Sequence, residues 1–241
     1  PVGQIYHVVS RYAPRDAQTK RRVNFAVNSW EPLYQELGVI PCHVWSTARD
    51  STRIGDNRKV PYFRDLLEIG LRATSHDDDV ILFTNDDTVL LPKVVSELLA
   101  TLKTSGCCCS FRLDYTGSIN TVQQLESGQV KGQHSYGRDL FAFKRSWLSH
   151  HLCNFPDDLI GTTDWDFFLS IYMRLQKGLE INHQMVGQPI PGIELKTGSV
   201  YHETHEPWWH KPENRYTSPA QRHNIRLTRQ FFEQHNLTHM L

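Results

Sequence analysis

Several features that define common protein classes are absent from this sequence. No apolar run approaches the roughly 20 residues that a membrane-spanning helix needs, and the polar N-terminal stretch PVGQIYHVVS lacks the layout of a signal peptide. Lys plus Arg and Asp plus Glu number 26 each, so the chain has no overall charge excess of the kind that binds nucleic acid or anionic membranes. We expect a soluble, cytoplasmic protein, unless a leader was removed, with no nucleic-acid partner.

Two fingerprints of nucleotide binding and one of metal binding are also missing. The chain has neither Gly-x-Gly-x-x-Gly nor a Walker-type Gly-Lys-Ser/Thr, so dinucleotide and P-loop chemistry lack sequence support. The five cysteines include no Cys-x-x-Cys spacing, and the three consecutive ones, 107–109, alternate across a predicted strand. Reduced, buried thiols are the simplest interpretation, and a zinc site that uses them stays open as the alternative.

The length and the periodicity of the chain predict an α/β fold. Its 241 residues can bury a full-sized core, and no linker is visible, so we expect one domain over 1–241. Strand and helix patterns alternate along the first third of the chain, with strands at 5–10, 39–45 and from 80 onward and helices at 19–37 and 62–73. This order predicts a Rossmann-like, mostly parallel central sheet flanked by helices.

The third predicted strand ends in a pair of carboxylates. The stretch 80–88 reads VILFTNDDT, in which an apolar run stops at Asn85, Asp86 and Asp87. Ligand sites of open α/β sheets lie beyond the carboxyl ends of the strands, and adjacent carboxylates there suit Mg²⁺ or Mn²⁺. The alternative is a solvated turn that begins the next helix, whose first turn contains Pro92.

Basic residues cluster in the segments that precede and follow these strands. Arg11 lies just past the first strand, and Arg53, Lys59 and Arg64 lie in the loop and helix start ahead of the third. Because loops that follow adjacent parallel strands converge on one edge, these cations could meet a diphosphate near Asp87. The alternative is that they only solvate exposed loops.

Two carboxylates stand at the start of a later helix. The polar, glycine-bearing stretch 114–136 has no clear period and is predicted to be a functional loop or a lid. In the segment 156–175, Asp164 follows a Gly-Thr-Thr turn, from which a carboxylate can project into a pocket as a general base. Asp166 is the second catalytic candidate. Its alternative role is a first-turn charge that the helix dipole favours.

A dense group of potential metal ligands lies near the end of the chain. The stretch 199–209, SVYHETHEPWW, holds His202 and His205 among two glutamates, and its two tryptophans offer flat faces that can stack on sugars or bases. Because the chain has 13 histidines, surface or core positions are the alternative for this pair.

In order and spacing, these motifs resemble the GT-A fold of nucleotide-sugar-dependent glycosyltransferases. The resemblance covers most of 5–205. It rests on an Asp-x-Asp-like strand end, Ile-Gly-x-x-Asp-Trp-Asp opening a helix, a late histidine, and a Gly-x-Asp-x-Phe-x-Phe strand made by Gly137, Asp139, Phe141 and Phe143. It implies a nucleotide-binding part over about 1–113 and an acceptor-side part over about 114–241.

The resemblance also implies roles for single residues. Asp87 would bind the Mn²⁺ or Mg²⁺ carried by the diphosphate of the sugar donor. Asn85 stands where the family commonly has Asp, which weakens the metal site or shifts a contact to Asp86. Asp164 would deprotonate the acceptor hydroxyl. Two histidines of the segment 199–209 are candidates for the late histidine that completes the metal shell: His202 is the first choice and His205 the second.

The sequence therefore predicts a metal-dependent glycosyltransferase that moves a sugar from a nucleoside-diphosphate sugar to an acceptor hydroxyl, inverting if Asp164 is the base. The acceptor class is open: a glycan, a small molecule or a protein. A sugar-nucleotide nucleotidyltransferase is the first alternative, although the loop SRYAPRD after the first strand has arginines without the glycines usual in such enzymes. A catalytically idle nucleotide- or sugar-binding module and a hydrolase built on the two histidines are the others.

Overall fold

The structure is a computed structural model. It describes residues 3–14, 16–45, 47, 51–52, 59–117, 119, 121–162, 165–185, 187–196, 198–205 and 219–240, and for 51, 52, 59 and 136 the backbone alone. Among the described helices, none combines the length with the apolar character of a membrane span.

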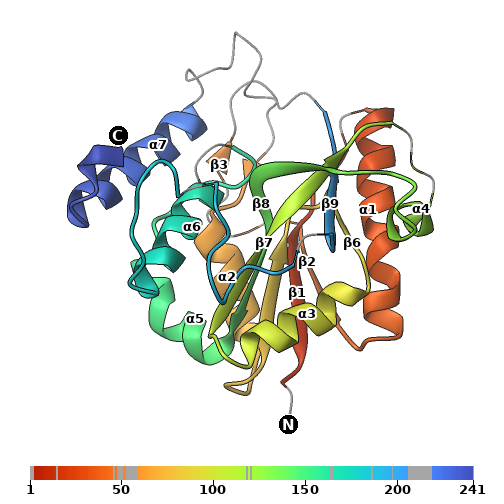
Figure 1. The fold of residues 1–241 in the computed structure, drawn as a ribbon, viewed down its shortest axis with the longest axis horizontal. Coiled ribbons are helices and arrows are strands. Elements are labelled where there is room, and N and C mark those ends of the chain that lie inside the picture. Colours follow the sequence, from red (N-terminus) through yellow and green to blue (C-terminus); the bar gives the residue numbers. More distant parts are fainter. Residues whose placement is uncertain are drawn as a thin grey trace.

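The described part of the chain alternates strands and helices (Figure 1). The strands are β1 (Ile5–Ser10), β2 (Ile40–Val44), β3 (Ser51–Thr52), β4 (Lys59–Val60), β5 (Val80–Thr84), β6 (Thr88–Leu90), β7 (Cys107–Tyr115), β8 (Gln133–Lys144) and β9 (Val200–Glu203). The helices are α1 (Ala17–Gln35), α2 (Phe63–Ala73), α3 (Lys93–Leu102), α4 (Val122–Glu126), α5 (Arg145–His151), α6 (Trp165–Gln176) and α7 (Pro219–Gln234), with short 3₁₀ turns at Leu152–Asn154 and Thr238–Met240.

Seven strands form one mixed sheet in the order β2-β1-β5-β8-β7-β9-β6. The pairs β1–β2, β1–β5 and β7–β9 are parallel, whereas β5–β8, β7–β8 and β6–β9 are antiparallel. The predicted α/β class with a Rossmann-like sheet between helices is confirmed. Parallel pairing is limited to β2-β1-β5 and to β7–β9, because β8 inserts antiparallel between β5 and β7 and β6 pairs antiparallel with β9.

A hydrophobic core lies on each face of the sheet, and β5 contributes to both. All five of its residues are buried; Ile81 and Phe83 belong to one core cluster, and Val80 and Leu82 to the other. Side chains of a strand alternate between the two faces, so a strand covered on both sides is apolar throughout. The apolar run that predicted this strand therefore reflects helices on both faces.

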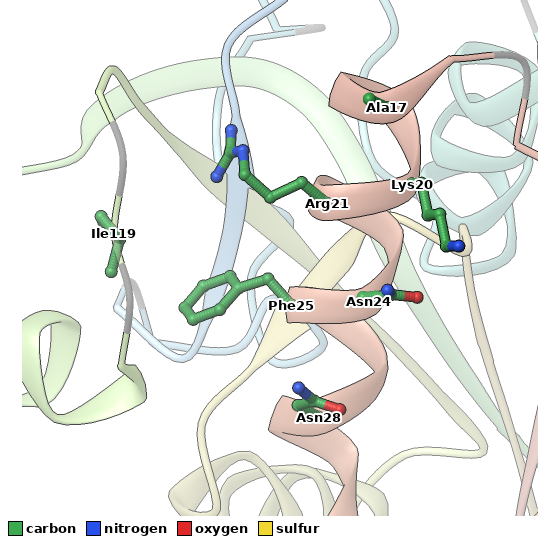
Figure 2. A pocket seen from close by; sticks show the side chains of 7 residues that line it. All are labelled: Ala17, Lys20, Arg21, Asn24, Phe25, Asn28 and Ile119. Carbon is green, nitrogen blue, oxygen red and sulfur yellow. The ribbon is translucent and has the colours of Figure 1, made fainter.

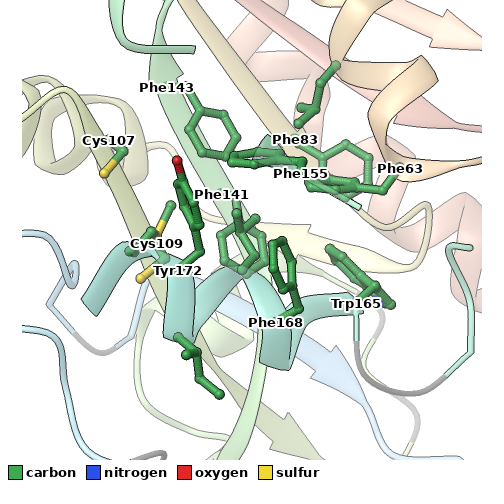
Figure 3. Packing of buried hydrophobic residues seen from close by; sticks show 14 of the residues in the cluster. Phe63, Phe83, Cys107, Cys109, Phe141, Phe143, Phe155, Trp165, Phe168 and Tyr172 are labelled. Atoms are coloured by element: carbon green, nitrogen blue, oxygen red, sulfur yellow. The ribbon is translucent and has the colours of Figure 1, made fainter. Parts of the chain in front are cut away.

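Trp165, the first residue of α6, anchors that helix on the sheet (Figure 3). Its ring contacts Phe83 and Phe141 edge-on, with centroids 5.6 and 5.7 Å away, and Phe63 at 5.2 Å. Aromatic pairs in these geometries add to the energy of apolar burial. The contacts hold the start of α6, which carries Asp166, beside β5 and β8.

The stretch 114–136, predicted to be irregular, is partly regular in the structure. It contains the end of β7, helix α4 and the start of β8. Helix α4 begins with a capping box, in which the Thr121 side chain accepts from the backbone of Gln124 and the Gln124 side chain accepts from the backbone of Thr121. The prediction missed this helix because five residues are too few to show a helical period.

Candidate functional site

The last strand of the sheet brings the late histidines to the carboxylate turn. Residues 85–87 form the turn between β5 and β6, and β6 pairs antiparallel with β9 so that Thr88 lies opposite His202. β9 also pairs with β7, which places Asp114 on the other side of His202. The strand register therefore holds His202 between Asp87 and Asp114.

Asp87, His202 and His205 form a compact group of potential metal ligands. Oδ2 of Asp87 lies 3.3 Å from Nε2 of His202 and 3.3 Å from Nε2 of His205. One ligand atom from each side chain fits within 4.8 Å of the others, and His202 is buried. One carboxylate oxygen and two imidazole nitrogens suit a first-row divalent cation. We call these three residues the triad.

Asp114 orients His202 from behind. Its Oδ1 lies 3.5 Å from Nδ1 of His202, on the side of the ring away from Asp87. A carboxylate at one ring nitrogen fixes the orientation and tautomer of an imidazole, so that the other nitrogen is presented to a metal. At 3.5 Å the contact is one of charge, since Nδ1 of His202 has no hydrogen-bond partner among the described residues, and it leaves Nε2 facing Asp87.

The triad is electrostatically coupled. Burial opposes the charged form of His202, but Asp87 and Asp114 raise the pKa of His202 to about 9. Burial also opposes ionisation of Asp87, yet His202 and His205 hold the pKa of Asp87 well below its usual range. A divalent cation that binds here must displace the proton of His202, so binding should be tighter at higher pH.

Arg112 links the triad to a second group of carboxylates. Its Nε donates to Asp114 at 2.8 Å, and its Nη1 donates to both oxygens of Asp139 at 3.0 and 2.8 Å. Asp139 is buried and also accepts from Nδ2 of Asn85 at 3.3 Å. The guanidinium therefore compensates two carboxylates that flank the Asn85–Asp87 turn.

Asp166 lies next to this group at the start of α6. Its Oδ2 accepts from the backbone N–H of Arg138 at 3.4 Å. Burial and the negative charge of Asp139 raise the pKa of Asp166, against the opposing effect of Arg112. A carboxylate whose charged form is disfavoured is a better proton acceptor than one held by cations.

The Asp166→Asn variant should be more stable than the wild type at pH 7 and less active. Because the folded-state pKa is raised, ionisation of Asp166 costs folding free energy above that pKa, and the amide removes this cost. We expect a melting temperature a few degrees higher at pH 7 and no gain near about pH 3, where both states hold the protonated acid. Asp77→Asn, at a side chain 80% exposed, is the control and should show neither effect.

Arg11 lies at the end of β1 between two indole rings. Its backbone N–H donates to Val44 at the end of β2, and its guanidinium carbon lies 5.4 Å from the ring centre of Trp45 and 6.0 Å from that of Trp30. Nε1 of Trp30 donates to the backbone oxygen of Thr88, directly after Asp87. The predicted cation therefore sits on the same sheet edge as the triad.

The structure describes only some of the remaining predicted site residues, and one of them by its backbone alone. Arg64 lies in the first turn of α2, where Nε is 3.4 Å from a carboxylate oxygen of Glu68. The backbone of Lys59 is in β4, while Arg53 and Asp164 lie outside the described residues, as do the two tryptophans of 199–209. Asp86 occupies the turn beside Asp87, with a partly buried side chain.

Sequence reasoning missed Arg112, Asp114 and Trp45. Arg112 and Asp114 are two apart in a strand and therefore share one face, which is a readable signal. However, the sequence analysis places Asp114 in the irregular stretch 114–136, whereas it lies in β7. Trp45 directly follows β2 and is 65% exposed, and only the structure reveals this exposure.

Comparisons with known proteins were made at the level of families, curated sequences and solved structures. No family model matches the chain, and no curated protein matches it. Among solved structures, the chain is similar to 4-diphosphocytidyl-2C-methyl-D-erythritol synthase from Anaerococcus prevotii, with 8% sequence identity, 97% of this chain and 100% of that chain covered, and a TM-score of 0.38. Similarity at this level assigns no activity to the present chain.

Proposed function

We propose that this protein is a divalent-cation-dependent transferase that moves a sugar from a nucleoside-diphosphate sugar to an acceptor hydroxyl. The observation that carries the proposal is the triad, which joins the carboxylate after β5 to two late histidines, one on β9 and one just beyond it. The order of these ligands along the chain is the one implied by the resemblance to GT-A glycosyltransferases.

The residues in and around the triad would have separate roles in such a reaction. Asp87, His202 and His205 would hold Mn²⁺ or Mg²⁺, which offsets the charge that develops on a diphosphate leaving group. Asp114 keeps Nε2 of His202 directed at the cation site. Asn85 is held by its hydrogen bond to Asp139, which fixes the turn that carries Asp87.

A carboxylate at the start of α6 would accept the proton of the acceptor hydroxyl. Asp164 is the first candidate by its position in the sequence motif. Asp166 is the second, because its environment disfavours its charged form. Trp165 between them packs against Phe83 of β5, so the start of the helix and the carboxylate turn share one rigid support.

Arg11 and Trp45 would bind the nucleotide part of the donor. The ends of β5, β1 and β2 lie side by side, and two strand spacings place the end of β2 roughly 10 Å from that of β5. An extended nucleoside diphosphate spans this separation, with its base against the exposed indole of Trp45 and its phosphates toward Asp87. Arg11 lies between these two positions.

Trp45→Ala should weaken binding of the nucleoside diphosphate about tenfold, because stacking of a base on an aromatic ring contributes roughly 1–3 kcal/mol. The fold should be unaffected, since 65% of Trp45 is exposed. Isothermal titration of the nucleotide in the presence of Mn²⁺ measures the change. Leu37→Ala, at an exposed apolar residue beyond the other end of β2, is the matched control. Equal affinities for both variants would remove Trp45 from the site.

Nucleotidyl transfer is the second candidate, because a cation at the triad and the cationic edge at Arg11 also suit a nucleoside triphosphate. Product analysis separates the two reactions. Glycosyl transfer releases a nucleoside diphosphate from a sugar nucleotide, whereas nucleotidyl transfer releases pyrophosphate from a nucleoside triphosphate and a sugar phosphate. Metal-dependent nucleotide binding without either product would indicate a binding module and contradict both activities.

A further inference from the structure

A concave surface lies along the N-terminal half of α1. It has a volume of about 410 Å³, in the range of small-molecule sites, and is open to solvent. It is lined by Ala17, Lys20, Arg21, Asn24, Phe25 and Asn28 from α1, and by Ile119 from the segment before α4. We call this surface the α1 pocket (Figure 2).

The helical repeat arranges the chemistry of the α1 pocket in two rows. Lys20, Asn24 and Asn28 are spaced by four residues and form one exposed row, and Arg21 and Phe25 form the adjacent row. In Figure 2, Arg21 and Phe25 extend toward β9 and Ile119, Lys20 and Asn24 point to the other side of α1, and Asn28 lies further along the helix. The two rows offer cations at one end of the pocket and amides at the other.

The charges of the α1 pocket favour an anion. Lys20 and Arg21 are both basic, and none of the described lining residues is acidic. The pocket also covers the first three turns of a 19-residue helix, where the helix dipole adds positive potential. These features together favour one negatively charged group near Lys20 and Arg21.

Arg21 is held in position from outside the pocket. Its Nη2 contacts a carboxylate oxygen of Glu203, whose side chain is 7% exposed, while the Arg21 side chain is 39% exposed. The ion pair fixes the guanidinium, so that donors not used by Glu203 are available without a large loss of side-chain freedom. Glu203 directly follows His202 in β9, so the α1 pocket adjoins the triad.

The other end of the pocket suits a polyhydroxylated ring. Asn24 and Asn28 carry amides that can both donate to and accept from hydroxyl groups. Phe25 and Ile119 supply an apolar wall, with Ile119 4% exposed and Phe25 packed against the core beneath α1. A ring with hydroxyls at its edge and C–H groups on its face complements such a wall.

From this arrangement we infer that the α1 pocket binds a saccharide carrying one negative group, a phosphate or a carboxylate. The negative group lies between Lys20 and Arg21, the hydroxyls meet Asn24 and Asn28, and one face of the ring packs on Phe25. This site is separate from the triad and needs no cation.

The test is a titration of the full chain in EDTA, which removes cation-dependent phosphate binding at the triad. Glucose 6-phosphate and glucuronate are the acidic probes, and glucose and inorganic phosphate are the neutral and sugar-free controls. We expect both acidic saccharides to bind and Lys20→Glu to weaken them about tenfold, through loss of a charge-assisted hydrogen bond. Asn24→Ala should weaken both saccharides and leave inorganic phosphate unchanged.

Arg229→Glu is the matched control, since it reverses an exposed charge inside α7 and should leave binding unchanged. Arg21 is not replaced, because its loss would leave the buried carboxylate of Glu203 without its cationic partner next to the triad. Three results would overturn the inference: no binding of either acidic saccharide, equal affinity in wild type and Lys20→Glu, or inorganic phosphate binding as tightly as glucose 6-phosphate.

Discussion

Asp87→Asn should weaken Mn²⁺ binding by about 100-fold or more and abolish cation-dependent turnover. Asp87 is the one carboxylate of the triad, and its oxygen lies 3.3 Å from each histidine nitrogen. The amide keeps the shape but removes the negative charge that binds a hard divalent cation. Titration of Mn²⁺ followed by electron paramagnetic resonance measures the affinity directly.

The same variant has a pH signature in the metal-free protein. Asp87 is the largest of the effects that raise the pKa of His202, to about 9 against an ordinary 6.5. A raised histidine pKa stabilises the fold fully below the ordinary value, and this stabilisation is lost as the pH rises through about 9. Asp87→Asn should therefore lower the melting temperature more at pH 6 than at pH 10.

Asp77→Asn is the matched control for Asp87→Asn. Asp77 precedes the amino end of β5, whereas the triad lies beyond the carboxyl end of that strand. The Asp77 side chain is 80% exposed and lies beside Arg145. It should bind Mn²⁺ with wild-type affinity. Wild-type Mn²⁺ affinity in Asp87→Asn itself would show that the triad is not the cation site.

Arg112→Met should lower the free energy of unfolding by about 2–3 kcal/mol and weaken Mn²⁺ binding about tenfold. The guanidinium makes hydrogen bonds of 2.8 to 3.0 Å to Asp114 and Asp139, and Asp139 is 3% exposed in its side chain. Without Arg112, no cation compensates the negative charges of these two carboxylates, which then repel each other and the carboxylate of Asp166. Asp114 would no longer be fixed behind His202, which explains the weaker cation binding.

Urea unfolding and Mn²⁺ titration measure the two effects separately. Arg145→Met, which removes the partner of the exposed Asp77, is the control and should change the free energy of unfolding by less than about 1 kcal/mol. Arg112→Lys keeps one charge but cannot reach both carboxylates with a planar fork, so it should recover stability only in part. A stable Arg112→Met protein with full Mn²⁺ affinity would contradict the positioning role.

The candidate site was predictable from sequence wherever one local signal sufficed. Asp87 comes shortly after a run of four apolar residues, and His202 and His205 lie in a dense ligand-rich segment, so each could be selected without knowledge of the fold. That they meet depends on the antiparallel pairing of β6 with β9, which joins residues more than a hundred positions apart. No periodicity within either segment encodes this pairing.

The fold shows the same division between local and distant interactions. The helical period of α1 and α2 and the apolar run of β5 predicted these elements to within a few residues. The insertion of β8 between β5 and β7, and hence the mixed sheet, follows from competition among strands for partners. Arg112 was missed because its role depends on Asp139, which reaches it through the β7–β8 pairing.

The most direct test of the triad is a thermal-shift screen of UDP, GDP, CDP, dTDP and ADP, each with and without Mn²⁺, on the wild type and Asp87→Asn. A ligand at 100 times its Kd stabilises a protein by about 2.7 kcal/mol, which such a screen detects. We expect one nucleotide to raise the melting temperature only with Mn²⁺ and only in the wild type. A nucleotide shift that persists without the cation, or no shift with any nucleotide, would contradict a cation-dependent donor site at Asp87, His202 and His205.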